Sequence, residues 1–430
     1  MRAIRGEILH FLDDPADRGV EALEHFPDGL LIVRDGHVAE AGPAEAILAK
    51  LPAGTPIEER RDKLILPGFI DTHIHFAQAD IIASHGEQLL EWLGKYTYPA
   101  ESRFADAGHA RSVAEFFCGE LLRNGTTTAM AFPTVHAASV DALFAAAAER
   151  RMRLITGKVL MDRNCPDFLR DTAARGYAES HALIEKWHGR DRLLYAVTPR
   201  FAATSTPEQM ALAGRLFAEH SGVYLQSHVA ENRREVAWVA ELYPEARSYL
   251  DVYDRFGHLG PRSVFAHCVW LDDADRARMA AAGAAMSFCP TSNLFLGSGL
   301  FDLDRAHAAG VRVGIGSDVG AGTSFSMLQT LNEAYKVLQL NGQSLSAERA
   351  FYLATLGGAR SLYLENSIGS FAPGREADFV VLDAAATPLL ARRTAACHTL
   401  AERLFVLMML GDDRAVAETW VMGEPAWRRP

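Results

Sequence analysis

The sequence predicts an α/β protein, a (β/α)8 TIM-like barrel with a small β domain formed from both chain ends. Between about residues 66 and 360, short apolar strands alternate with amphipathic helices, and eight such strands can be identified. Eight is the number that closes a barrel of this kind, which typically occupies roughly 250 residues. The chain ends lack this alternation and contain further strand-like segments, which predict the β domain.

Each predicted barrel strand is a short run rich in β-branched, aromatic or other apolar residues. The eight runs are residues 66–76, 126–134, 153–162, 193–201, 223–229, 263–270, 284–292 and 312–320. Helical stretches between them include residues 112–125, 142–151, 207–222 and 273–283, and several end at Gly, a common stop signal. Residues 76–108 form an unusually long connection after the first strand. Long ordered connections often serve as lids or binding loops.

The two chain ends predict a second, smaller unit. Residues 29–42 indicate two strands around an Asp-Gly turn, and residues 377–384 and 417–427 are also strand-like. Residues 388–411 look helical. We therefore predict a small β domain from residues 1–66 and 375–430 together, with a barrel domain of residues 67–374 inserted between them.

Bulk composition is typical of a soluble globular enzyme, with 49% hydrophobic and 23% charged residues. A net charge of −11 without a basic stripe argues against a nucleic-acid partner. No apolar run approaches the length of a membrane helix, and the charged N-terminus does not fit a signal peptide. We therefore expect a cytoplasmic protein without a membrane partner. The five cysteines form no C-x-x-C pair, and we expect most of them to be buried.

Two histidines lie at the end of the first predicted strand. His73 and His75 are separated by one residue, and side chains two apart on a strand point to the same face. They can therefore direct two imidazoles at one point, as a metal site requires. Two structural, hydrogen-bonded histidines are the simpler alternative. The metal hypothesis needs further ligands from other strands.

Other predicted strands supply such residues at their carboxyl ends, where the catalytic residues of a barrel gather. Arg200 and Phe201 end the fourth strand, His228 lies on the fifth, His267 on the sixth and Asp318 on the eighth. Each histidine alone is more often structural, but their convergence favours a shared site. Histidine nitrogen and carboxylate oxygen suit Zn²⁺, with Fe²⁺ or Mn²⁺ as rivals.

Several longer motifs carry a family resemblance that covers essentially the whole chain. They are PGFIDTHIHFAQADIIAS (67–84), GEQLLEWLGKYTYPAE (86–101), VTPRF (197–201), QSHVAEN (226–232), AHCVWL (266–271) and GSDVGAG (316–322). Together they resemble the amidohydrolase superfamily of metal-dependent hydrolases and, within it, the guanine deaminase family. The resemblance implies zinc-dependent hydrolysis of guanine to xanthine and ammonia in purine catabolism, by a homodimer.

The same resemblance implies particular roles for nine residues. The implied ligands of one zinc ion per chain are His73, His75, His228 and Asp318. The implied substrate-binding residues are Gln78, Arg200, Phe201 and His267, and His267 also neighbours the metal-bound water. The implied catalytic residues are Glu231, Asp318 and His267.

Hydrolytic deamination requires chemical roles that these residue types can fill. Zinc lowers the pKa of bound water from 15.7 to about 7, and Asp318 can accept the proton that the water loses. Glu231 can protonate the ring nitrogen and then the departing amine. Arg200 is a strong donor to the C6 carbonyl of guanine, and Gln78 can both donate to and accept from the purine edge. The simpler alternatives are a solvated Glu231 and an Arg200 that only forms a salt bridge.

Lys158 raises the question of a second metal. Two-metal members of the superfamily use a carboxylated lysine at a strand end, usually on the fourth strand, where this chain has Pro199 and Arg200. Lys158 lies on the third predicted strand, short of its end, so we expect one metal and a structural lysine. In the long connection, Trp92, Tyr96 and Tyr98 can close a lid, or they can simply pack it.

Three other functions compete with guanine deamination. Another deaminase or a chlorohydrolase of the superfamily, acting on cytosine, an adenine nucleoside or a triazine, would keep the metal ligands and differ at Gln78, Arg200 and Phe201. A non-catalytic barrel scaffold would be expected to lack ligands, and none is missing. A cytidine-type zinc deaminase would carry an H-x-E and P-C-x-x-C signature, which the chain lacks.

Overall fold

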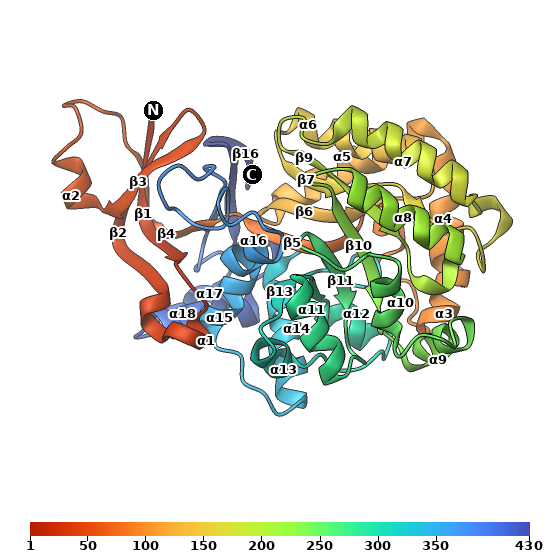
Figure 1. Cartoon of the computed structure of the whole chain (residues 1–430). Helices are drawn as coiled ribbons and strands as arrows, with labels where there is room; N and C mark the ends of the chain where they lie inside the picture. Colours follow the sequence, from red (N-terminus) through yellow and green to blue (C-terminus); the bar gives the residue numbers. More distant parts are fainter.

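The computed structural model describes all 430 residues and contains a barrel and a separate sheet (Figure 1). The barrel strands are β5 (Phe69–His75), β6 (Thr126–Phe132), β7 (Arg153–Thr156), β9 (Leu193–Pro199), β10 (Tyr224–Val229), β11 (Ser263–His267), β12 (Ala285–Phe288) and β13 (Arg312–Ile315). Neighbours along this order are parallel, and the short β8 (Val159–Leu160) pairs with β9. Every predicted barrel strand is present, which confirms the predicted barrel.

The barrel closes between its first and last strands without a regular ladder. No β5–β13 ladder forms, but two backbone hydrogen bonds join these segments. The N–H of His75 donates to the carbonyl of Val319 at 2.8 Å, and the N–H of Asp318 donates to the carbonyl of His73 at 2.9 Å. The seam of the barrel therefore runs through residues that the sequence predicts as metal ligands.

Helices surround the barrel on its outer side (Figure 1). Those following the barrel strands are α5 (Ala107–Arg123), α6 (Ala137–Glu149), α7 (Ala173–Trp187), α8 (Pro207–Glu219), α9 (Arg233–Leu242), α10 (Tyr249–Arg255), α11 (Asp273–Ala282), α12 (Pro290–Phe295), α13 (Leu303–Ala308), α14 (Met327–Leu340), α15 (Ala347–Tyr352) and α16 (Gly358–Ser361). The predicted helices at 112–125, 142–151, 207–222 and 273–283 match α5, α6, α8 and α11. Gly283 ends α11 in the left-handed region, at φ 76°, where a residue without Cβ is unstrained.

An apolar cluster fills the barrel toward the N-terminal ends of its strands. Its members include Ile70, Met130, Ile155, Ala196, Tyr224, Val264 and Ala285, one from each of seven strands. Residues Ala359, Leu362, Leu364 and Ile368 from α16 and the segment after it complete the cluster. Polar side chains are thus concentrated at the opposite, carboxyl ends of the strands, where the site lies.

The second sheet combines both chain ends, as predicted. Its strands, in spatial order, are β16 (Glu424–Arg428), β15 (Val416–Val421), β14 (Phe379–Leu382), β4 (Glu58–Pro67), β1 (Arg2–Phe11), β2 (Leu23–Arg34) and β3 (His37–Pro43). Asp35 and Gly36 connect β2 and β3 with φ of 50° and 81°, as a tight hairpin turn requires. Strands β1 and β4 were not predicted. The domain boundaries at 66/67 and 374/375 stay a prediction.

Several predicted segments differ from the structure in extent. Residues 290–292, predicted as strand, begin helix α12, because β12 ends at Phe288. The predicted helix at 388–411 is two helices, α17 (Pro388–Thr394) and α18 (Leu400–Leu410). The long connection at 76–108 is mostly helical turns, including α3 (Leu89–Trp92), a π-helical turn (Leu93–Thr97) and α4 (Tyr98–Ser102). The remaining short helices are α1 (Pro15–Arg18) and α2 (Ala44–Leu48).

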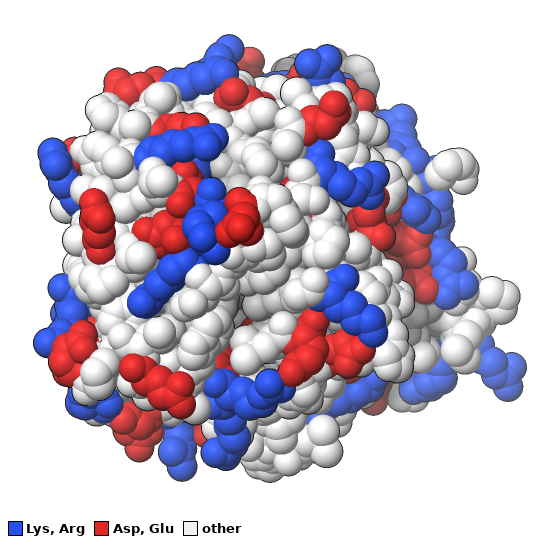
Figure 2. Space-filling model, turned by 90° about the vertical axis from the view of Figure 1, so that its right-hand side faces the viewer, with Lys and Arg blue, Asp and Glu red and all other residues white.

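The surface carries charges of both signs. Figure 2 shows the face at the right-hand side of Figure 1, where basic and acidic side chains are interspersed without an extended patch of one sign. None of the helices combines the length and the apolar character that crossing a membrane demands. Four of the five cysteines are buried and all are free, which confirms the prediction that most are buried.

Candidate active site

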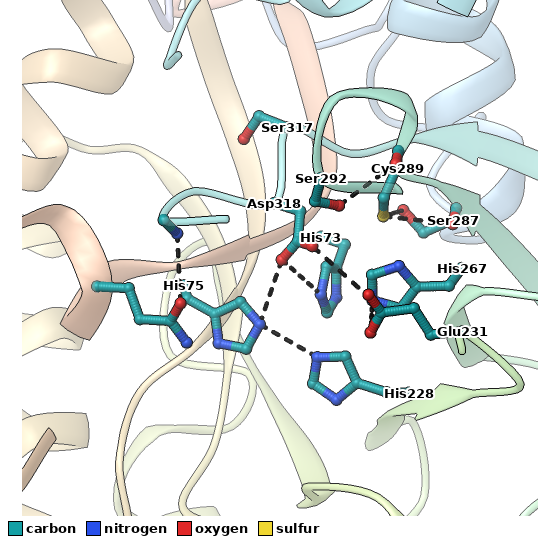
Figure 3. A network of polar contacts seen from close by, with 12 residues as sticks. His73, His75, His228, Glu231, His267, Ser287, Cys289, Ser292, Ser317 and Asp318 are labelled. Atoms are coloured by element: carbon teal, nitrogen blue, oxygen red, sulfur yellow. Dashed lines mark hydrogen bonds and ion pairs between the residues drawn. The ribbon is translucent and has the colours of Figure 1, made fainter. Parts of the chain in front are cut away.

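Four side chains converge at the carboxyl end of the barrel (Figure 3). The Nε2 atoms of His73 and His75 lie 3.2 and 3.4 Å from Oδ1 of Asp318. The Nε2 atoms of His75 and His228 lie 3.1 Å apart. A tetrahedral zinc ion with bonds of about 2.0–2.2 Å separates its ligand atoms by roughly 3.3 Å. These three separations are therefore close to those between ligands of one metal ion. Two overlapping groups of side chains are also close enough to hold an ion, namely His73, His228 and His267, and His73, Cys289 and Asp318.

The protonation of these groups also fits a metal. The buried Nε2 atom of His73 forms no hydrogen bond, and its nearest charged neighbour is Oδ1 of Asp318 at 3.2 Å. Nδ1 of His228 lies 2.6 Å from the carbonyl of Arg200, so the donated proton sits on Nδ1 and Nε2 is free to bind. Burial lowers the pKa of His75 and of His228 well below the ordinary value, which keeps both imidazoles neutral, as ligands must be.

A buried carboxylate links the two strands that supply three of these ligands. Asp71 of β5 accepts hydrogen bonds from the backbone N–H of His73 and from the backbone N–H and hydroxyl of Ser317. Asp318 itself has a left-handed φ of 51°. Such a conformation in a non-glycine residue is held only where surrounding contacts determine it. Asp71 provides such contacts on both sides of the seam.

His267 and Glu231 form the catalytic side of the site. Nε2 of His267 lies 3.4 Å from Oε2 of Glu231 and 3.8 Å from Oδ2 of Asp318. Its Nδ1 lies 2.9 Å from Oδ1 of Asn293. Burial alone would lower the pKa of His267, but Glu231 and Asp318 outweigh it and the net shift is upward. His267 thus lies between the two carboxylates and is farther from Asp318 than His73 and His75 are.

The two carboxylates differ in acidity. Burial raises the pKa of Glu231 to about 7, although His267 acts in the opposite direction. The hydroxyl of Ser298 donates to Oε1 of Glu231 at 2.8 Å, which leaves Oε2 on the His267 side. Burial would also raise the pKa of Asp318, but His73 and His267 outweigh it and the pKa is about 2. Glu231 can therefore exchange a proton near neutral pH, whereas Asp318 stays ionised.

The neighbouring wall of the site is built around Arg200. Arg200 directly follows β9, is only 2% exposed, and lines the same pocket as Gln78 and Phe201. Its Nη1 donates to both oxygens of Glu101, at 2.9 and 2.8 Å. The salt bridge that the sequence offered as the alternative role of Arg200 is therefore present. It coexists with a position on the pocket wall.

The long connection after β5 covers the pocket. Leu89, Trp92, Leu93 and Thr97 from α3 and the following turn line it. The Trp92 ring packs against Tyr96 at a centroid distance of 4.9 Å. Tyr98 instead lies against the guanidinium of Arg200, whose Cζ is 5.5 Å from the ring centroid. Of the three aromatic residues predicted to close or pack the lid, only Trp92 lines the pocket.

The structure brings the predicted site residues together. Eight of the nine line one pocket, namely His75, Gln78, Arg200, Phe201, His228, Glu231, His267 and Asp318. The ninth, His73, contacts Asp318. Lys158 lies elsewhere, buried in an ion pair with Asp171 and 3.4 Å from Oε2 of Glu179.

Sequence reasoning missed several supporting groups, which are Asp71, Glu101, Glu235, Asn293 and Ser298. Glu235 accepts hydrogen bonds from the N–H of Glu231 at 3.0 Å and from the Tyr249 hydroxyl at 2.7 Å. Asp71 and Glu101 lie inside motifs that carried the resemblance, so their position was available as a signal. A polar residue inside an apolar or aromatic segment is such a signal, because burial of a charge requires a partner.

Comparison with known proteins identifies the family. Residues 64–426 match the model of the amidohydrolase family. The match spans the whole barrel and, in the second sheet, β14, β15 and parts of β4 and β16. The chain belongs to the amidohydrolase family.

Within this family, the chain is most clearly similar to several guanine deaminases. A guanine deaminase of Escherichia coli strain K12 is 52% identical over 100% of this chain and 98% of its own length. The structure of the E. coli guanine deaminase covers both chains completely with a TM-score of 0.98. A guanine deaminase from C. acetobutylicum with bound guanine is 28% identical, with a TM-score of 0.89 and 99% of each chain covered. These comparisons confirm the predicted resemblance to the guanine deaminase family.

Proposed function

We propose that the protein hydrolyses guanine to xanthine and ammonia. The observation that carries this function is the joint occurrence of closely spaced histidine and aspartate side chains, a carboxyl group that titrates near neutrality, and a guanidinium wall in one pocket. Relatives named guanine deaminase, one 52% identical over the whole chain, support the same conclusion. A non-catalytic scaffold is disfavoured because it would not need to keep all of these groups.

The family is typically metal-dependent, and the site offers histidine and carboxylate ligands for a metal. We propose one Zn²⁺ per chain, held by His73, His75, His228 and Asp318, with Fe²⁺ and Mn²⁺ less favoured. Three histidines and one carboxylate, with three of their separations at 3.1–3.4 Å, support zinc. When bound, such an ion makes water a usable nucleophile at neutral pH.

Glu231 is proposed to move protons between water, ring and leaving group. With a pKa of about 7, its carboxyl group is protonated in a large fraction of molecules at neutral pH. It can give that proton to the ring nitrogen beside the carbon under attack, take up the remaining proton of the attacking oxygen, and pass it to the departing amine. Asp318, which stays ionised, can accept a proton from water, while His267 steadies the oxygen between the two carboxylates.

Arg200, Gln78 and Phe201 are proposed to select the purine. Nη1 is the guanidinium nitrogen that bonds within the protein, so Nε and Nη2 of Arg200 keep their N–H donors for a ligand. The C6 carbonyl of guanine is a matching acceptor, whereas the C6 amine of adenine would place donor against donor. Gln78 offers an amide to the purine edge, and Phe201 offers an apolar wall.

A parallel substrate assay tests the proposal. Purified metal-loaded protein is offered guanine, adenine, cytosine and a chlorotriazine, and ammonia or chloride release is followed. We expect guanine to be by far the best substrate. A higher kcat/KM on any of the other three would replace guanine by that substrate, and the metal site would remain.

Elemental analysis tests the metal. We expect close to one zinc per chain, lost on changing His73 or Asp318 to Ala and kept on changing Lys158 to Met. Two metals per chain, with one of them lost from the Lys158→Met protein, would defeat the single-metal proposal.

Two further properties belong to the proposal. We propose a homodimer in the cytoplasm, with a small purine as partner and without a nucleic-acid or membrane partner. The interspersed charges on the face in Figure 2 support only the lack of a nucleic-acid partner. Light scattering at several protein concentrations would measure the mass of the assembly, and a monomer throughout would contradict the dimer.

A further inference from the structure

Glu101 is a fully buried carboxylate next to the purine wall. It belongs to α4, in the connection that covers the pocket, and its exposed fraction is 0%. Burial raises its pKa, while Arg200 acts in the opposite direction. Its contacts are the two hydrogen bonds from Nη1 of Arg200 and a longer one, 3.5 Å, from Nε2 of Gln78. Both of its partners line the pocket, although Glu101 itself does not.

These contacts fix the guanidinium of Arg200. Without a partner, the long side chain of arginine has many rotamers. Here Nη1 is held by both oxygens of Glu101, and the guanidinium carbon lies over the Tyr98 ring, 5.5 Å from its centroid. The two contacts restrict the position of the guanidinium. Nε and Nη2 are the donors left to a ligand.

The same carboxylate fixes which way the Gln78 amide points. A carboxylate only accepts hydrogen bonds, so the nitrogen of the amide must face Glu101. At the other end, the backbone N–H of Gly320 lies 3.4 Å from Oε1 of Gln78, and an N–H only donates. The two neighbours therefore specify one of the two amide orientations. Each end of the amide keeps hydrogen-bonding capacity for a purine.

We propose that Glu101 is a positioning residue that orients Arg200 and Gln78 toward the purine and so sets selectivity for a C6 carbonyl. The inference rests on the proposed function for its substrate, but the orientation of Arg200 can be tested without it. Glu101 also ties the connection that covers the pocket to β9, because Arg200 directly follows that strand.

The test uses Glu101→Gln, which keeps the size of the side chain but removes the charge and turns one acceptor into a donor facing Arg200. Glu101→Asp keeps the charge on a shorter side chain and serves as the conservative rescue. Asp171→Asn is the matched control, because Asp171 is a buried partner of Lys158 away from the pocket. Metal content and thermal unfolding of all variants are recorded.

Guanine is compared with 2-aminopurine, which carries the same amine but lacks the C6 oxygen. Glu101→Gln should lower kcat/KM for guanine about 10- to 100-fold, because a hydrogen bond to a charged group is lost. It should lower kcat/KM for 2-aminopurine much less. Glu101→Asp should recover part of the guanine activity, and Asp171→Asn should change neither value. On an Arg200→Ala background, Glu101→Gln should cause no further selective loss.

Equal losses on both purines, or an additive loss on the Arg200→Ala background, would reduce Glu101 to a structural residue. A crystal structure of metal-loaded Glu101→Gln protein gives an independent answer. We expect the Arg200 guanidinium to leave its parental orientation, and an unchanged orientation would overturn the inference. If the parent releases ammonia from neither purine, the proposed function fails, and the position of Arg200 in this variant still decides the role of Glu101.

Discussion

Two buried ion pairs, each with a basic residue one or two positions after a barrel strand, differ in the hydrogen-bond donors that they leave available to a ligand. Arg200 follows β9 and pairs with Glu101, while Lys158 follows β7 and pairs with Asp171. The exposed fractions of the two basic residues are 2% and 1%. Only Arg200 lines the pocket. Burial and pairing therefore do not separate a substrate-binding residue from a structural one.

The difference lies in the donors that remain. The guanidinium gives Nη1 to Glu101 and keeps N–H groups on Nε and Nη2, in a fixed planar fork. The ammonium of Lys158 is a compact group close to two carboxylates, Asp171 and Glu179. An arginine can thus be neutralised by the protein and still bind a ligand. A lysine ammonium enclosed by two carboxylates has few N–H donors left for a ligand.

Removing the proton carrier of the pocket should have the largest effect on turnover. Glu231→Gln keeps the size of the side chain and removes the titrating carboxyl. General acid–base groups contribute about 10²–10⁴-fold, so kcat on guanine should fall by that order while zinc is retained. Stopped-assay ammonia release and elemental analysis measure both. Near-normal turnover in zinc-loaded Glu231→Gln protein would remove Glu231 from the proton path.

Breaking the pair outside the pocket should lower stability. Lys158→Met leaves Asp171 buried without its ammonium partner, and such a loss costs about 3–5 kcal/mol. Urea unfolding followed by circular dichroism measures it, and kcat on guanine should stay at the parental value. A loss of metal without a loss of stability would instead connect Lys158 with the metal site and end the contrast between the two pairs.

Truncating the arginine should affect the substrate. Arg200→Ala should cut kcat/KM for guanine about tens- to hundred-fold, because a hydrogen bond from a charged donor is worth about 1.5–3 kcal/mol. Zinc content should not change. The variant also strands Glu101, so its stability is measured alongside. If the Arg200→Ala protein deaminated guanine as efficiently as the parent, both ion pairs would be structural.

A buried histidine that belongs to neither pair gives the smallest effect and a reference for the pH dependence of stability. Burial lowers the pKa of His258 to about 4, and its Nε2 lies 2.8 Å from the carbonyl of Met210. In the unfolded chain the pKa of His258 is about 6.5. On acidification the unfolded state therefore binds a proton that the folded state does not bind. Stability should therefore fall by about 2 kcal/mol between pH 7 and pH 5 from this group.

His258→Gln should remove that part of the pH dependence. Urea unfolding of parent and variant at both pH values measures the difference in slope. Identical slopes would show that His258 titrates alike in both states, and acid sensitivity would then have to be sought in the metal site.

The barrel and its ligands were predictable because each barrel strand carries a strong local signal and its functional residue sits at the strand end. His228, His267 and Asp318 follow apolar runs, so strand order alone places them together. Strands β1 and β4 were not predicted because they mix charged and apolar residues. In β1, Arg2 and Arg5 form ion pairs along the sheet that no local pattern reveals.

The supporting residues of the site were harder to predict, because their partners are distant in the chain. Glu101 and Arg200 are in contact but 99 residues apart in the chain, and Asp71 and Ser317 are in contact but 246 residues apart. Such pairs depend on the closed barrel rather than on spacing along the chain. The alternative roles of Arg200 could not be separated from sequence for the same reason, since the structure shows both the salt bridge and the pocket position.

The open seam between β5 and β13 has a consequence for biosynthesis. Strand β5 leaves the ribosome early, but its seam partners, Asp318 and Val319, are made only after all the other barrel strands. The second sheet is completed later still, because β14, which pairs with β4, and β15, which pairs with β14, are translated after the barrel. Early strands therefore persist with unpaired edges until translation is nearly complete, the condition under which nascent chains aggregate. Sequences that slow the last third of translation should lengthen the chain's dependence on chaperones.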